Sequence, residues 1–158
     1  MPKKYQSHRL FIDGPVGQLE ATLDSLVEEI PIGSVIICHP HPLYGGTMDN
    51  KVAHTLSRAF IKLGYNSLRF NFRGTKNSEG KFDSGIGELD DLLAVIKWMK
   101  AREHSEILWL AGFSFGAAIA INASSIIKVD GLISVAPAVE KFTNFTNQPQ
   151  CPWLILQG

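Results

Sequence analysis

The stretch Gly112-Phe113-Ser114-Phe115-Gly116 has the pattern Gly-x-Ser-x-Gly. It follows an apolar run at residues 107–111, which is typical of a strand, and precedes small residues at 117–123, which favour a helix. A serine at a tight strand-to-helix turn needs glycines on both sides because strand and helix approach closely there. The pattern therefore predicts a nucleophile elbow, in which the Ser114 hydroxyl projects above a sheet. The alternative for these five residues alone is an ordinary glycine-rich turn.

The composition is that of an ordinary globular chain. Fifteen basic residues balance fifteen acidic ones among 158, and Lys and Arg are scattered, so neither nucleic acid nor a membrane is expected as a partner. A small-molecule substrate is the expected partner. The length predicts one domain over residues 1–158, and the polar N-terminus predicts no signal peptide. Cys38 and Cys151 are expected to be buried thiols, which fits a cytoplasmic location.

The order of apolar and polar segments predicts an α/β fold with a mostly parallel sheet, an N-terminal antiparallel hairpin and helices on both faces. The hairpin is predicted at residues 9–13 and 18–23, and further strands at 34–38, 66–72, 107–111, 132–136 and 153–156. The loops that follow these parallel strands should meet at the carboxyl edge of the sheet, where ligands bind in such folds.

Two long helices are predicted between the strands. The first is capped by Asp49 or Asn50 and ends before Gly64, and the second is capped by Asp83 or Ser84. Apolar spacing predicts a buried stripe on each helix. In the first it comprises Val52, Leu56, Ala59, Phe60 and Leu63, and in the second Ile86, Leu89, Leu92, Leu93, Ile96 and Met99.

Three motifs in this order resemble those of the α/β-hydrolases: GFSFG at 112–116, CHPHPLYGG at 38–46 and RGTKNSEG at 73–80. Nearly the whole chain resembles the small cytosolic serine hydrolases related to dienelactone hydrolases and to the catalytic domains of prolyl-oligopeptidase-type enzymes. The resemblance implies that the chain hydrolyses a carboxylic ester or related acyl substrate. It implies no metal or organic cofactor, and it implies that the last strand and helix of the fold are absent.

The resemblance also implies roles for individual residues. Ser114 would be the nucleophile, and the backbone N–H of Phe115 would be one oxyanion donor. The second donor is expected from the loop after residue 38, where prolines lack an N–H, which leaves His41 or Leu43, with His41 preferred. His39 and His41 are expected to brace this loop rather than to bind a metal.

Arg73 is expected to belong to a structural turn beside the site, although its side chain could instead meet an acidic substrate group. A serine hydrolase also needs an acid and a histidine after the nucleophile, and no histidine follows Ser114. Three interpretations stay open. The sequence is a fragment of a longer hydrolase, it is a non-catalytic binding domain, or it improvises a triad from Ser114, His41 and Glu140. The apolar final strand at 153–156 is expected to be an exposed edge that favours self-association.

Overall fold

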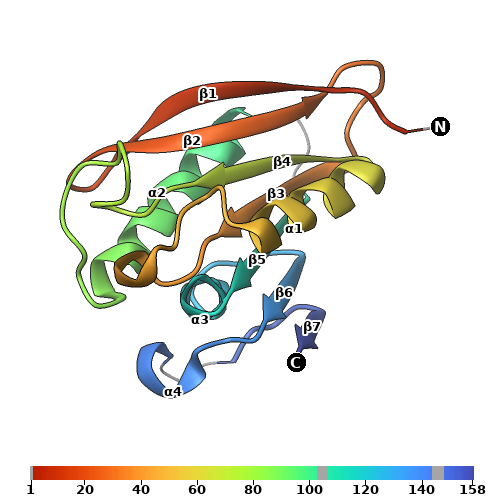
Figure 1. Ribbon diagram of the computed structural model, residues 1–158. Coiled ribbons are helices and arrows are strands. Elements are labelled where there is room, and N and C mark those ends of the chain that lie inside the picture. Colours follow the sequence, from red (N-terminus) through yellow and green to blue (C-terminus); the bar gives the residue numbers. More distant parts are fainter. Residues whose placement is uncertain (1, 103–106, 144–147) are drawn as a thin grey trace.

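The computed structural model describes residues 2–102, 107–143 and 148–158, which form a seven-stranded sheet flanked by helices (Figure 1). The strand order is β1-β2-β4-β3-β5-β6-β7. The strands are β1 (Tyr5–Gly14), β2 (Gly17–Leu26), β3 (Gly33–Cys38), β4 (Tyr65–Phe70), β5 (Leu108–Phe113), β6 (Gly131–Val135) and β7 (Trp153–Leu156).

The strand directions confirm the predicted sheet. β1 pairs antiparallel with β2, and β2 pairs antiparallel with β4. All the other neighbours are parallel. The hairpin strands are longer than predicted because alternating polar residues on an exposed edge extend β1 beyond its apolar centre.

Helices cover both faces of the sheet. On one face, α1 (Lys51–Lys62) packs against β3 and β5 in a small apolar cluster. On the other face, α2 (Ile86–Arg102) and α3 (Phe115–Ser124) enclose the larger core together with the hairpin. A 3₁₀ turn (Pro42–Tyr44) follows β3, and the short helix α4 (Val139–Phe142) follows β6.

The predicted start and end of α1 are confirmed. The side chain of Asn50 accepts hydrogen bonds from the N–H groups of Val52 and Ala53, and Gly64 has the positive φ of 95° that ends the helix. Leu56 and Phe60 of the predicted α1 stripe are buried as expected, whereas Ala59 is exposed. The buried residues of α1 are Ala53, Leu56, Ser57, Phe60 and Ile61, whereas Leu63 is exposed because it lies beyond the last helical residue.

In α2, Leu92, Ile96 and Met99 of the predicted stripe are buried, as expected. Ile86, at the first residue of the helix, is exposed, while two acidic residues, Glu88 and Asp91, are fully buried. Both carboxylates accept hydrogen bonds: Glu88 accepts the N–H groups of Asp83 and Gly85, and Asp91 accepts from Arg73. Within the described residues, no helix has the length and apolar character needed to cross a bilayer.

Candidate active site

Ser114 lies between the end of β5 and the first residue of α3, in the strand-turn-helix context that the sequence predicts. Its backbone has a φ of 54° and a ψ of −112°, which a non-glycine residue rarely adopts. Surrounding hydrogen bonds hold this conformation. The N–H of Ser114 donates to Val135 O at 2.9 Å, and its carbonyl accepts from Ala138 N–H at 3.1 Å. The β6–α4 segment therefore fixes the serine from one side.

The two glycines of the motif are required by close backbone contacts. A Cβ on Gly116 would lie 2.2 Å from the carbonyl oxygen of Cys38, and one on Gly112 would lie 2.6 Å from the nitrogen of Ala117. Real Cβ atoms do not approach other atoms this closely. The turn thus brings the start of α3 against the end of β3, where the next loop begins.

The loop of residues 39–46, called the His39 loop below, starts with a buried histidine. His39 Nδ1 lies 2.7 Å from Pro40 O, and Phe72 N–H donates to His39 Nε2 at 3.1 Å. Burial lowers the pKa of His39 to about 4. The ring is therefore neutral at pH 7 and bridges the ends of β3 and β4.

His41 holds the middle of the same loop. Its Nδ1 accepts the N–H of Leu43 at 3.2 Å, and its carbonyl oxygen accepts the N–H groups of Tyr44 and Gly46. Burial lowers the pKa of His41, and Lys141 lowers it further, whereas Glu88 opposes this. Both loop histidines thus make the bracing hydrogen bonds that the sequence predicts.

These bonds decide which N–H groups remain for a ligand. Leu43, the alternative second donor, gives its N–H to the His41 ring. In the part of the chain that the structure describes, the N–H groups of His41 and Phe115 have no hydrogen-bond partner. The two residues also touch, with ring centroids 5.1 Å apart.

A cavity of about 410 Å³ lies over Ser114. His41 and Tyr44 line it from the His39 loop, and Pro137 to Phe142 line it from the β6–α4 segment. The volume falls in the range of small-molecule sites. The sequence placed Glu140 near the site but did not predict the helix α4, because a helix of four residues leaves no periodic signal.

The loop after β4 is a structural turn, as the sequence predicts. Arg73 is buried, and its guanidinium donates to both carboxylate oxygens of Asp91 and to the carbonyl of Gly87. The hydrogen bond from Arg73 to Asp91 raises the pKa of the guanidinium. Arg73 is therefore already paired, which argues against the alternative that it meets an acidic substrate group.

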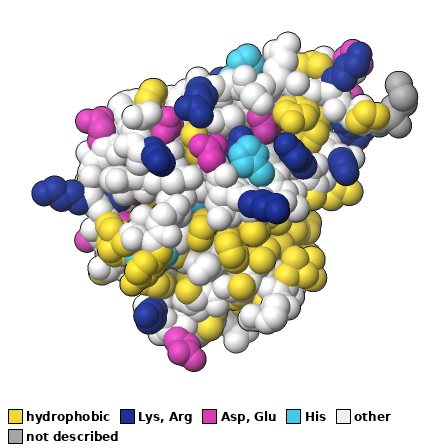
Figure 2. All heavy atoms as spheres, in the orientation of Figure 1, with side chains coloured by type: hydrophobic (Ala, Val, Ile, Leu, Met, Phe, Trp, Pro, Cys, Tyr) yellow, Lys and Arg dark blue, Asp and Glu magenta, His cyan; other side chains and the backbone are white. Residues whose placement is uncertain are grey.

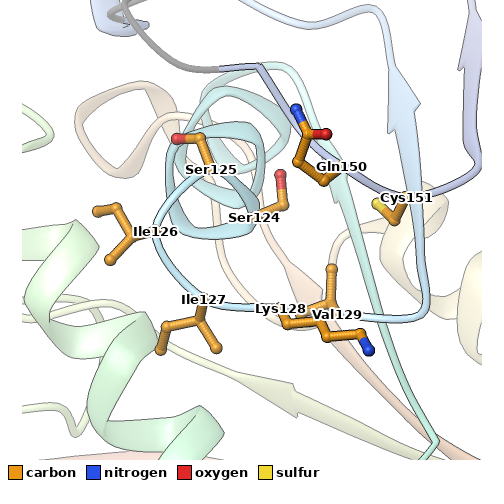
Figure 3. A pocket seen from close by; sticks show the side chains of 8 residues that line it. All are labelled: Ser124, Ser125, Ile126, Ile127, Lys128, Val129, Gln150 and Cys151. Carbon is orange, nitrogen blue, oxygen red and sulfur yellow. The ribbon is translucent and has the colours of Figure 1, made fainter.

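A second cavity, of about 290 Å³, lies at the end of α3 opposite to Ser114. Figure 3 shows the residues that line it. Cys151 and Gln150 line it together with residues 124–129. Cys151 is half-buried rather than fully buried as predicted, whereas Cys38 is fully buried. Burial and the nearby Asp130 raise the pKa of the Cys151 thiol, so it is not activated as a nucleophile. Among the described residues, no cluster of three or more His, Cys, Asp or Glu could hold a metal ion.

Solved structures that are similar to this chain include α/β serine hydrolases. Residues 28–148 match the model of the family described as X-Pro dipeptidyl-peptidase (S15 family). An α/β serine hydrolase without a lid from Xanthomonas campestris superposes with a TM-score of 0.91 and 41% identity, over 97% of this chain and 71% of that one. An α/β serine hydrolase homologue from Coxiella burnetii gives 0.88 and 48%, over 96% and 73%.

Two curated proteins are similar to this chain in sequence. An uncharacterised protein of Rickettsia prowazekii is 34% identical over 95% of this chain, and the chain spans 65% of its length. The lysophosphatidylserine lipase ABHD12 of Danio rerio is 33% identical over 53% of this chain and 23% of its own.

Proposed function

We propose that this chain, which belongs to the S15 family within the α/β-hydrolase superfamily of serine hydrolases, cleaves a carboxylic ester or related acyl substrate through an acyl-enzyme on Ser114. The observation that carries the proposal is the Ser114 turn, which is strained, held by hydrogen bonds and open to a cavity. The S15 description names a peptidase, and a similar structure from Pyrococcus furiosus is an esterase at 26% identity. Both reactions transfer an acyl group to a nucleophile.

In the proposed reaction, Ser114 Oγ attacks the carbonyl carbon of the substrate. The N–H groups of Phe115 and His41 stabilise the developing oxyanion, and each such donor is typically worth about 3 kcal/mol. The carbon–oxygen bond to the leaving alcohol then breaks, the alcohol takes up a proton, and water hydrolyses the ester on Ser114. The cavity above Ser114 would hold a small acyl group between apolar and aromatic walls.

The Oγ proton must pass to a base, and the histidines of the His39 loop are unsuited to this role. Both ring nitrogens of His39 are engaged. The ring of His41 uses Nδ1 as an acceptor for Leu43, where an orienting acid such as Glu140 would need an N–H. This hydrogen bond argues against the triad improvised from Ser114, His41 and Glu140. The proposal therefore places the base outside the His39 loop.

A fluorophosphonate probe tests the proposal because it reacts only with an activated serine. The folded chain should be labelled, and Ser114→Ala should abolish the labelling. Ser125→Ala is the matched control, since Ser125 follows the last residue of α3 and lies away from the cavity over Ser114. Labelling that survives Ser114→Ala contradicts the proposal. Folded protein without any labelling means that Ser114 is not activated in this chain, which supports instead the non-catalytic binding domain or a fragment without its base.

A further inference from the structure

The imidazole of His41 is surrounded by aromatic rings from separate parts of the chain. Ring centroids lie 4.7 Å away at Tyr44, 5.0 Å at Phe82, 5.1 Å at Phe115 and 5.6 Å at Phe142. These rings come from the 3₁₀ turn, the β4–α2 loop, the start of α3 and the end of α4. The His41 side chain therefore joins the His39 loop to the Ser114 turn.

The hydrogen bonds assign opposite tautomers to the two loop histidines. In a neutral imidazole, one ring nitrogen carries the hydrogen and the other accepts. His41 accepts at Nδ1 from Leu43 N–H, so its hydrogen is on Nε2. His39 accepts at Nε2 from Phe72 N–H, so its hydrogen is on Nδ1 and points to Pro40 O.

We propose that the neutral His41 side chain is a positioning residue that clamps the His39 loop against the Ser114 turn and so fixes the spacing of the His41 and Phe115 N–H groups. This inference rests on the proposed function only for its consequence in catalysis. Two backbone hydrogen bonds also hold His41 in place, because its carbonyl oxygen accepts the N–H groups of Tyr44 and Gly46. Among the described residues, no group accepts the N–H of His41 itself, which leaves it for a ligand.

The lack of room for a side chain at Gly46 supports the same arrangement of the loop. A Cβ there would lie 2.1 Å from Pro40 O and 2.6 Å from His41 O, so the loop can close this tightly only with glycine. The 3₁₀ turn follows directly after His41, whose half-buried ring contacts the ring of Phe115.

Protonation should open the clamp. An imidazolium carries hydrogens on both nitrogens, so Nδ1–H would face the N–H of Leu43, and the hydrogen bond would be lost. The charged groups that act on the ring are Lys141 of α4, which disfavours protonation, and Glu88 of α2, which favours it. Glu140 of α4 lines the same cavity.

Histidine-ring ¹H–¹⁵N spectroscopy of the folded chain at pH 7 tests the clamp directly. His41 should be a single neutral tautomer with hydrogen on Nε2, and His39 should be the opposite tautomer. His41→Ala identifies the His41 signals. A hydrogen on Nδ1 of His41, or a ring that averages both tautomers, would overturn the proposal.

Two substitutions separate the hydrogen bond from the ring contacts. His41→Asn keeps an acceptor that can reach the N–H two residues on, whereas His41→Phe keeps a ring without an acceptor. Amide exchange of Leu43 should be about fivefold faster in His41→Phe than in His41→Asn, as expected for one hydrogen bond of ordinary net strength. Equal exchange rates in the two variants contradict the assigned bond.

The catalytic consequence is read separately with the fluorophosphonate probe. His41→Ala should slow the maximal rate of labelling by up to about 100-fold, the order expected when one oxyanion donor is lost. The probe concentration that gives half of this maximal rate should change little. A chain that is not labelled at all contradicts the proposed function, while the tautomer and exchange measurements still decide the clamp. Unchanged labelling in His41→Ala would show that the clamp does not position the donors.

Discussion

Ser114 combines a side chain with a backbone conformation that favours glycine, with φ at 54°. Such a conformation typically costs about 1–3 kcal/mol and persists only where its surroundings impose it. We expect Ser114→Gly to be more stable than Ser114→Ala by about 1 kcal/mol, because glycine relieves the strain but loses more chain entropy on folding. Urea unfolding of the two variants measures the difference. Equal stability, or a more stable alanine variant, would show that the turn is not strained.

His39 should make the folded chain sensitive to mild acid. Burial lowers its pKa from the ordinary value of 6.5 to about 4 in the folded chain, so the unfolded chain takes up a proton at a higher pH than the folded chain does. The contribution of neutral His39 to the free energy of unfolding is complete above pH 6.5 and is lost as the pH falls towards 4. The loss over that range amounts to about 3 kcal/mol.

Unfolding free energies measured at several pH values check this prediction. His39→Asn should flatten the dependence between pH 6.5 and 4 because asparagine does not titrate. His8→Asn, at an exposed residue of β1, should leave the dependence as in the original chain. A dependence that is the same in all three proteins would mean that other groups cause it.

The sequence predicted the Ser114 turn because its constraints are local: two glycines, a strand before and a helix after. The surroundings of His41 could not be predicted in this way. Its four aromatic neighbours are spread from Tyr44 to Phe142, and only the closed fold brings them together. The same holds for Leu43, whose N–H is taken by a side chain two residues earlier.

The buried pair of Arg73 and Asp91 joins the loop after β4 to α2. The Arg73 and Asp91 side chains are 8% and 0% exposed, and Arg73 Nη2 lies 2.8 Å from Asp91 Oδ1. Removing one partner of a buried pair leaves the other charge uncompensated, which typically costs about 3–5 kcal/mol. We expect Asp91→Asn to lower the free energy of unfolding by about 3 kcal/mol in urea titrations.

Asp90→Asn is the control for this prediction because it makes the same charge change at the neighbouring, exposed residue of α2. It should change the stability by less than about 0.5 kcal/mol. Similar losses in both variants would point to a general charge effect rather than to the Arg73 pair.

The ends of a helix were predicted correctly where apolar spacing and capping residues agree. The buried face of a helix was predicted incorrectly where it contains charged residues. Asn50 and Gly64 mark the ends of α1 in the sequence and in the structure. Asp91, by contrast, reads as an exposed position on α2, because its partner is Arg73 in a loop far from it in the chain. The burial of a charged residue can therefore be predicted only when the residue that compensates its charge is known.

Apolar surface gathers beside the last strands of the sheet (Figure 2). A groove of about 320 Å³ runs from Phe60 and Trp109 to Trp153 and Leu154. β7 lies at the edge of the sheet, and in the described part of the chain it pairs only with β6. Its outer backbone groups are therefore open to another strand.

We expect the 158-residue chain to self-associate through this edge, since Leu154, Ile155 and Leu156 are 52%, 45% and 46% exposed. Light scattering coupled to size-exclusion chromatography should show a mass that rises with protein concentration. Ile155→Lys should keep the chain monomeric because a charge on an edge strand opposes pairing. Ile30→Lys, at a residue that is 92% exposed and distant from β7 in the sequence, should associate like the original chain. A monomer at every concentration would contradict association through β7.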